Sequence, residues 1–160
     1  MAYRIGFGYD VHQLRENESL ILGGCKIDYS LGTVAHSDGD VLVHAICDAI
    51  LGAAKLGDIV THFPDNNNKY IIVNSMTLLS ESYNMVKKAG YLLNNIDCTI
   101  CLEKPKLKDY IKQIEQNLAK VLETDILNIS VKATTTEKLG FVGSQEGISA
   151  YCAAMLKNVE

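Results

Sequence analysis

The order in which strand-like and helix-like segments follow one another is the feature that most constrains the fold. A helix is expected from Val41 to about Lys55, because apolar residues recur there at helical spacing, Asp40 can cap its start and Gly57 lies beyond its end. Strand-like sequence precedes this helix and returns after it. The pattern favours a mixed sheet covered by helices, in the α/β or α+β two-layer class.

The other elements are expected from the same kinds of pattern. Strands are predicted at Tyr3 to Gln13, Tyr91 to Leu102 and Ile129 to Ala133, a hairpin at Leu20 to Leu22 and Lys26 to Tyr29 around Gly23-Gly24, a loop at Ser30 to Gly39, and further helices from Asn74 or Ser75 to near Gly90, from about Leu107 to Leu122 and from Ile148 to Leu156.

The length and composition limit the class of protein. The chain has 160 residues and no internal repeat, so we expect a single domain over residues 1–160. No apolar run approaches the roughly 20 residues that cross a bilayer, which predicts a protein without a membrane partner. No export signal is visible at the start. We therefore expect a cytoplasmic protein, or one in a plastid-type organelle if a targeting segment has been removed.

The net charge and the cysteine content argue against a nucleic-acid-binding protein and against a disulfide-bonded one. The net charge is −4 and no stretch is rich in Lys or Arg, which argues against a nucleic-acid partner. An anionic ligand would then need metal ions and backbone amides for much of its positive potential. The five cysteines are expected to remain unpaired. Cys98 and Cys101 have the spacing of a metal or redox pair, but on a strand they face opposite sides, which favours buried thiols.

A possible metal site lies on the first strand and the first helix. Asp10 and His12 are two residues apart on a strand, so their side chains leave the same face. His44 falls on the first turn of the helix, and Asp48 four residues on could hold its other ring nitrogen. Asp, His and His with one open position suit a catalytic zinc ion. The alternatives are an ordinary surface strand pair and a packed helix histidine.

Several loop residues are candidates for binding an anionic ligand. His36 and Ser37 precede the helix, where His36 either donates to an anion or lies on the surface. Asp58 and the run Phe63-Pro64-Asp65 are either ordinary loop residues or ligand contacts. His62 is expected on the surface.

Two later segments offer phosphate-binding chemistry. Thr134, Thr135 and Thr136 follow a strand and can donate hydroxyl and amide hydrogens to phosphate oxygens, while Glu137 can hold a divalent ion. A polar turn with a capping threonine is the alternative. The segment Lys104-Pro105-Lys106 could equally be a plain helix start with proline near its first turn.

Taken together, these segments carry a family resemblance. The segments that carry it are Arg4-Ile5-Gly6 to Asp10-Val11-His12, Ala35-His36-Ser37-Asp38-Gly39-Asp40 to His44, Leu51-Gly52-Ala53-Ala54 to Gly57-Asp58-Ile59, Phe63-Pro64-Asp65, and Lys132 to Phe141. In this order and spacing the chain closely resembles the 2-C-methyl-D-erythritol 2,4-cyclodiphosphate synthase family over essentially its whole length. The resemblance implies a homotrimer with sheets facing its axis, helices outside and active sites shared at the subunit boundaries.

The resemblance also implies roles for individual residues. Zinc would be bound by Asp10, His12 and His44, and a second cation, Mg²⁺ or Mn²⁺, by Glu137. His36 and Thr135 would stabilise the transition state. The residues expected to contact substrate are Asp10, His12, His36, Ser37, Asp58, Phe63, Asp65, Lys104, Lys106, Ala133, Thr134, Thr135, Thr136, Glu137 and Phe141. Of these, Ser37, Asp58 and Asp65 would line the methylerythritol pocket, and residues 102–108 and 133–135 of the neighbouring subunit would hold the cytidine end.

The implied reaction belongs to the non-mevalonate isoprenoid pathway. The 2-phosphate of 4-diphosphocytidyl-2-C-methyl-D-erythritol 2-phosphate would attack the β-phosphorus and displace CMP, giving the cyclic diphosphate without a protein nucleophile. A zinc phosphohydrolase would instead release a linear product. A non-catalytic trimeric module with structural zinc is the third alternative.

Some positions depart from the expected family pattern. Ser144-Gln145 stands where the family usually has an arginine, Asn67 where an acid is common, and Glu103-Lys104 where small neutral residues precede the proline. Lys104 or Lys108 could compensate for the missing positive charge.

Overall fold

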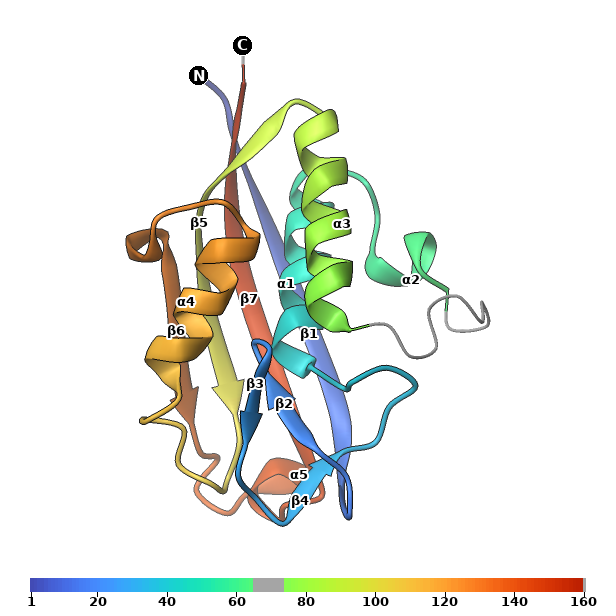
Figure 1. Ribbon diagram of the computed structural model, residues 1–160, viewed down its shortest axis with the longest axis vertical. Helices are drawn as coiled ribbons and strands as arrows, with labels where there is room; N and C mark the ends of the chain where they lie inside the picture. The colour runs from blue at the N-terminus through green and yellow to red at the C-terminus, as the bar shows by residue number, and fades with distance from the viewer. Residues whose placement is uncertain (65–73, 160) are drawn as a thin grey trace.

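The computed structural model describes residues 1–64 and 74–159, which form a mixed sheet with helices on one face (Figure 1). The five-stranded sheet has the order β4-β1-β7-β5-β6. Its strands are β1 (Tyr3–Glu16), β4 (Leu31–Thr33), β5 (Tyr91–Cys101), β6 (Ile129–Thr134) and β7 (Gly147–Asn158). Pairing is antiparallel for β1-β4, β1-β7 and β5-β7, and parallel for β5-β6. The expected α+β class is confirmed.

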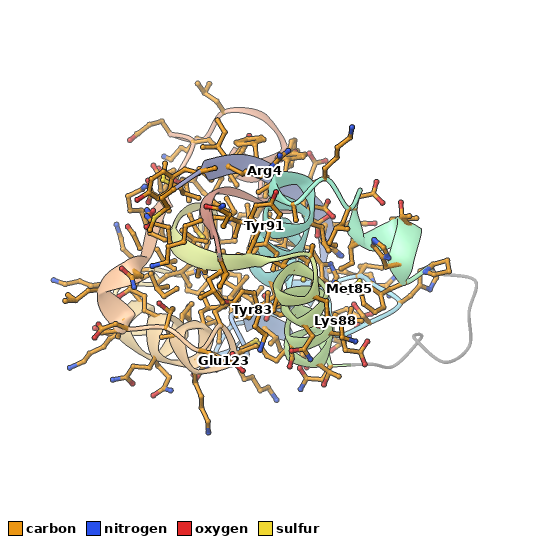
Figure 2. The ribbon with its side chains drawn as sticks, turned by 90° about the horizontal axis from the view of Figure 1, so that it is seen from above. Arg4, Tyr83, Met85, Lys88, Tyr91 and Glu123 are labelled. Carbon is orange, nitrogen blue, oxygen red and sulfur yellow. The ribbon has the colours of Figure 1, made fainter. Side chains whose placement is uncertain are left out.

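The long helices lie on one side of this sheet, as the view from above also shows (Figure 2). The elements outside the sheet are α1 (Val41–Ala53), α2 (Ile59–His62), α3 (Ser75–Lys88), α4 (Ile111–Val121), α5 (Gly140–Gly143), the 3-10 helix η2 (Ile126–Asn128) and the hairpin of β2 (Leu20–Leu22) and β3 (Cys25–Ile27). None of the helices in the described ranges is long and apolar enough to cross a membrane.

Helix α1 is apolar around most of its surface because it is buried between the sheet and α3. Two glycines on β1 permit its close approach. A Cβ atom on Gly6 would lie 1.9 Å from the carbonyl oxygen of Ala49, and one on Gly8 would lie 1.8 Å from that of Ala45. Any larger side chain would therefore push the helix away from the strand.

The opposite face of the sheet is apolar and exposed. On β1 the even-numbered residues face α1, so the odd-numbered ones point away from the helices. Ile5 is 78% exposed, Phe7 66% and Tyr9 42%, and Tyr151 of β7 lies beside the last two. A contiguous apolar surface of this kind is typical of a protein–protein interface.

The predicted terminal helix is wrong, because residues 147–158 form β7, which lies between β1 and β5. Ile148, Ala150 and Cys152 alternate with Ser149 and Tyr151, and the first set faces the core. The period of two is hidden in the sequence because the outward face of β7 also carries apolar residues, so the run looks continuous.

Most other predicted elements are confirmed to within a few residues. Helix α4 begins later than expected, at Ile111, because the chain from Leu107 to Tyr110 forms a turn, in which the Tyr110 amide donates to the Leu107 carbonyl oxygen at 2.9 Å. Strand β4 lies in a segment expected to be a loop. All five cysteines are free, as predicted.

Candidate active site

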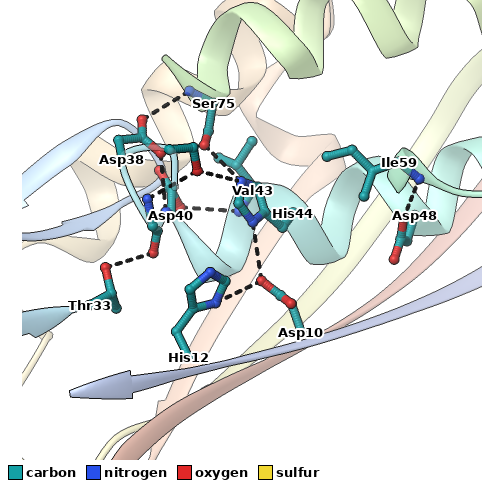
Figure 3. Close-up of polar contacts among 12 residues, drawn as sticks. Asp10, His12, Thr33, Asp38, Asp40, Val43, His44, Asp48, Ile59 and Ser75 are labelled. Atoms are coloured by element: carbon teal, nitrogen blue, oxygen red, sulfur yellow. Dashed lines mark hydrogen bonds and ion pairs between the residues drawn. The ribbon is translucent and has the colours of Figure 1, made fainter. Parts of the chain in front are cut away.

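Strand β1 and helix α1 together form the metal-ligand group predicted from the sequence (Figure 3). The Asp10 Oδ2 atom lies 3.0 Å from His12 Nδ1 and 3.2 Å from His44 Nδ1. Potential ligand atoms of the three residues all lie within 4.8 Å of one another. The two imidazole rings are tilted, with centroids 5.5 Å apart. One ion can therefore contact all three side chains.

The chemistry of this group fits a zinc ion. The Nδ1 atom of His12 is buried and makes no hydrogen bond, although Asp10 Oδ2 lies 3.0 Å away. A buried ring nitrogen without a hydrogen bond is costly unless a ligand occupies it. Two imidazoles and one carboxylate form a donor set used by catalytic zinc, which keeps a fourth position open.

Burial and charge act in opposite directions on this group. Burial raises the pKa of Asp10, but the neighbouring His12 and His44 outweigh it and hold the pKa below its ordinary value. Burial likewise lowers the pKa of His44, while the adjacent Asp10 raises it above the ordinary value. The carboxylate is therefore ionised at neutral pH, as a metal ligand must be.

Asp48 does not hold the second ring nitrogen of His44, contrary to the sequence-based expectation. Its Oδ1 atom accepts a hydrogen bond from the backbone N–H of Ile59 at 2.8 Å. The Nε2 atom of His44 lies instead 2.9 Å from Ser75 Oγ, at the start of α3 (Figure 3). Spacing along α1 could not reveal a partner that comes from another helix.

Asp40 fixes the start of α1 against the hairpin. Its side chain caps the helix by accepting from the backbone N–H of Val43 at 3.1 Å, and it also accepts from Gly23 at 3.0 Å and Gly24 at 2.8 Å. Burial raises the pKa of Asp40 to about 6, although the three N–H donors act to lower it.

A cavity of about 370 Å³ opens over the metal-ligand group. Its lining contains the expected residues Asp10, His12, His36, Ser37, His44 and Phe63, together with the apolar residues Val34, Ile59, Val60 and Leu78 and the small Ala35. Nothing in the sequence singled out Val34, Val60 or Leu78, because isolated apolar residues carry no chemical motif.

Two residues beside this cavity, Asp58 and His62, do not line it. Asp58 instead caps α2, accepting from the Thr61 amide at 2.9 Å and its hydroxyl at 2.7 Å. These bonds lower the pKa of Asp58. His62, expected on the surface, is half-buried and has its Nε2 atom 2.6 Å from the Leu56 carbonyl oxygen. Asp65 and Asn67 lie outside the described residues.

A second pocket, of about 540 Å³, lies at the end of β6. The expected residues Lys106, Ala133, Thr134 and Thr135 line it, with Lys108 and Glu103 beside them. The remaining candidates Lys104, Thr136, Glu137 and Phe141 do not line this pocket.

The segment after β6 is held by Glu103, one of the departures from the family pattern. Its Oε1 atom accepts from the Thr136 amide at 3.3 Å and from the Lys138 amide at 3.4 Å. Glu137 and Lys138 adopt positive φ angles of 54° and 64°, and Glu137 is exposed. An acidic residue here therefore fastens the turn that presents Glu137.

Ser144 and Gln145, which stand where the family usually has an arginine, form hydrogen bonds to other side chains of the protein. Ser144 Oγ donates to Glu146 Oε2 at 2.8 Å, and the hydroxyl of Tyr29 donates to Gln145 Oε1. No positive charge stands at these two positions.

The two pockets of one chain lie far apart. The metal ligands of the sheet are on β1, and the second pocket is at β6, with β7 and β5 between them. Three strand spacings amount to roughly 14 Å. Figure 1 shows β6 at one edge of the sheet and β1 near the other.

Comparison with known proteins identifies the family. A model described as the YgbB family matches residues 3–157. The chain is 52% identical over 159 residues to a 2-C-methyl-D-erythritol 2,4-cyclodiphosphate synthase from Bacteroides fragilis, covering 99% of this chain and 100% of that one. It is 54% identical over 159 residues to the enzyme of the same name from Carboxydothermus hydrogenoformans, covering 99% and 98% of the two chains.

Solved structures agree in fold. A bifunctional IspDF from Campylobacter jejuni superposes with a TM-score of 0.96 at 46% identity, over 99% of this chain and 43% of that longer chain. An IspF from Plasmodium falciparum, in complex with CDP, superposes with a TM-score of 0.87 at 36% identity, over 99% and 98%. The chain therefore belongs to the YgbB family, the family of 2-C-methyl-D-erythritol 2,4-cyclodiphosphate synthases.

Proposed function

We propose that this protein converts 4-diphosphocytidyl-2-C-methyl-D-erythritol 2-phosphate to 2-C-methyl-D-erythritol 2,4-cyclodiphosphate with release of CMP, a phosphorus–oxygen lyase step of the non-mevalonate isoprenoid pathway. The observation that carries the proposal is the group of Asp10, His12 and His44 at the base of a cavity. The full-length relatives bear the name of this enzyme.

The reaction needs no nucleophile from the protein. The substrate's 2-phosphate oxygen forms a new bond to the β-phosphorus, and the bond from that phosphorus to the bridging oxygen of CMP breaks, so CMP leaves with the electron pair. The main task of the site is to fold the substrate so that attack is in line, which converts proximity into rate. Asp10, His12 and His44 would hold zinc, which supplies Lewis-acid polarisation of a phosphate oxygen.

The remaining side chains would bind and neutralise the substrate. His36 at the cavity would donate to a phosphate oxygen, and the hydroxyl of Thr135 would do so from the second pocket. Glu137 would hold a second cation, Mg²⁺ or Mn²⁺, on the diphosphate. Ser37, Asp58 and Asp65 would contact the methylerythritol, and residues 102–108 and 133–135 the cytidine.

A homotrimer would unite these two halves. The roughly 14 Å between β1 and β6 means that the metal cavity of one subunit and the β6 pocket of a neighbour would form one site. The exposed apolar face of the sheet, with Ile5 and Phe7, would line the axis. We propose a single catalytic domain over residues 1–160, working in the cytoplasm.

The experiment that tests this function is product analysis. Purified protein is incubated with zinc, magnesium and the substrate, and products are followed by phosphorus NMR and mass spectrometry. CMP and a cyclic diphosphate are expected, and His44→Ala should abolish both. His62→Ala, which alters a histidine outside the metal group, is the control and should retain turnover. A linear phosphate product would establish a hydrolase instead, and zinc binding without turnover would establish a binding module.

A further inference from the structure

Ser75 joins a third element, α3, to the metal-ligand group. It lies at the first position of that helix and is fully buried. Its Oγ atom lies 2.9 Å from His44 Nε2 and donates a hydrogen bond to Asp38 Oδ1. The backbone N–H of Ser75 donates to the other oxygen of Asp38 at 2.9 Å. Figure 3 shows these contacts as a chain that runs from Asp38 through Ser75 and His44 to Asp10.

The number of available hydrogens fixes the direction of these bonds. A serine hydroxyl carries one hydrogen, and an ionised carboxylate only accepts. The hydrogen of Ser75 is therefore committed to Asp38, which also accepts from the Asp40 amide at 3.2 Å. The Ser75 oxygen can then only accept, and the hydrogen between it and His44 must be on Nε2.

We propose that Ser75, held by Asp38, is a positioning residue that fixes the ring of His44 with its hydrogen on Nε2. The Nδ1 atom, which lies 3.2 Å from Asp10 Oδ2, then carries no hydrogen, so its lone pair can bind a metal. The inference rests on the proposed zinc site. Partners of this kind orient a ligating histidine, and their loss typically weakens metal binding by about 10- to 100-fold.

Other polar groups near His44 do not replace Ser75. Asp48, on the same helix, accepts from the Ile59 amide. Ser37 Oγ is 3.5 Å from His44 Nε2 and is already the acceptor for the Gly39 amide at 3.3 Å. Removing the hydroxyl of Ser75 would leave Nε2 with the weaker of its two contacts.

Zinc affinity tests the inference without relying on turnover. The dissociation constant is measured by competition with a chromophoric chelator for the wild type, Ser75→Ala and Ser82→Ala. Ser82 is the matched control because it lies on the same helix and is equally buried. We expect Ser75→Ala to bind zinc about 10- to 100-fold more weakly and Ser82→Ala to bind as the wild type does. Thermal unfolding of the metal-free proteins checks that the variants fold.

A spectroscopic measurement on the wild type makes the test independent of any variant. In the zinc-loaded protein with ¹⁵N-labelled histidine, the His44 Nε2–H should give a downfield, slowly exchanging resonance, and that proton should exchange rapidly in Ser75→Ala. A hydrogen on Nδ1 of the wild type would overturn the inference. So would equal zinc affinity of the wild type and Ser75→Ala, with the zinc site itself intact. A wild type that binds no zinc would overturn the proposed metal site and this inference together.

Discussion

Asp40 is a carboxyl group buried in the interior that serves three backbone N–H donors at once. Its position joins the hairpin turn to the first turn of α1, four residues before His44. The N–H donors favour the ionised form, but burial disfavours it more and raises the pKa to about 6. The same residue is thus the helix cap and a source of pH dependence.

The sign of this dependence follows from linkage. The folded pKa of Asp40 lies above its unfolded value of 3.8, so the folded state binds more protons between these two values. The free energy of unfolding therefore falls as pH rises through this window. A shift of this size corresponds to about 3 kcal/mol.

We therefore predict that wild type loses about 3 kcal/mol of stability relative to Asp40→Asn between about pH 3 and pH 7, as measured by urea unfolding. Asp58→Asn is the control with opposite sign. Its pKa is lowered by Thr61, so wild type should gain stability relative to that variant as pH rises. A flat difference for Asp40→Asn would contradict the prediction.

At the scale of single residues, the sequence predicted the metal ligands but not their partners. Asp10 and His12 are two apart on one strand, and local geometry is enough to bring them together. Ser75 was recognised only as a possible start of a helix, because its contacts with Asp38 and His44 depend on how α3 packs. Lys104 and Glu137 remain candidates because their roles depend on a bound substrate.

Among the elements, β1 and α1 pack closely against each other beside the site. The glycines at positions 6 and 8 let backbone meet backbone, and two residues further along β1 the metal ligands begin. The distance between Asp10 and His44 is therefore set by the absence of side chains on the strand. This contact ties the stability of the core to the geometry of the site.

We predict that Gly8→Ala destabilises the protein by about 3 kcal/mol and weakens zinc binding. The new Cβ would lie 1.8 Å from the Ala45 carbonyl oxygen, so the helix must move. Gly52→Ala, on the outer side of α1, is the control. Nothing lies within 4 Å of its new Cβ, and the change should stabilise the helix by about 0.5–1 kcal/mol. Denaturant unfolding and zinc titration measure both effects, and equal behaviour of the two variants would refute the argument.

The strand β7 marks the limit of prediction at this scale. An element with one buried and one solvated face, such as α3, was predicted close to its true bounds. In β7 the outward residues Tyr151 and Met155 are as apolar as the inward ones. A period of two disappears when both faces are apolar, and alanines favour helix by local propensity.

For the whole molecule, the exposed face of the sheet predicts assembly. Phe7→Glu would place a charge at the centre of the apolar surface formed with Ile5, Tyr9 and Tyr151. We expect this variant to sediment as a monomer while wild type sediments as a trimer. Leu127→Glu, at a residue 91% exposed on η2, is the control and should remain a trimer. A trimeric Phe7→Glu protein would show that another surface forms the interface.

Shared sites make a sharper prediction, by subunit mixing. His44→Ala and Thr135→Ala should each be inactive, yet trimers refolded from equal amounts should recover roughly one quarter of wild-type activity. Half of the subunits offer an intact metal cavity, and half of their neighbours an intact β6 pocket. Mixing His44→Ala with Asp10→Ala, which damages the same half twice, should recover none. Absence of recovery in the first mixture would place both halves of a site in one chain.

The separation of the two pockets across the sheet also determines how much activity is lost when wild-type and mutant subunits assemble into the same trimers. In the proposed homotrimer, a subunit mutated only at β6 inactivates one site, so activity declines in proportion to the fraction of mutant chains. A subunit mutated at both pockets inactivates two sites, and activity then declines with the square of the fraction of wild-type chains. Because β1 and β6 belong to different sites, a mutation that affects both pockets lowers the activity of mixed trimers more than a mutation that affects one.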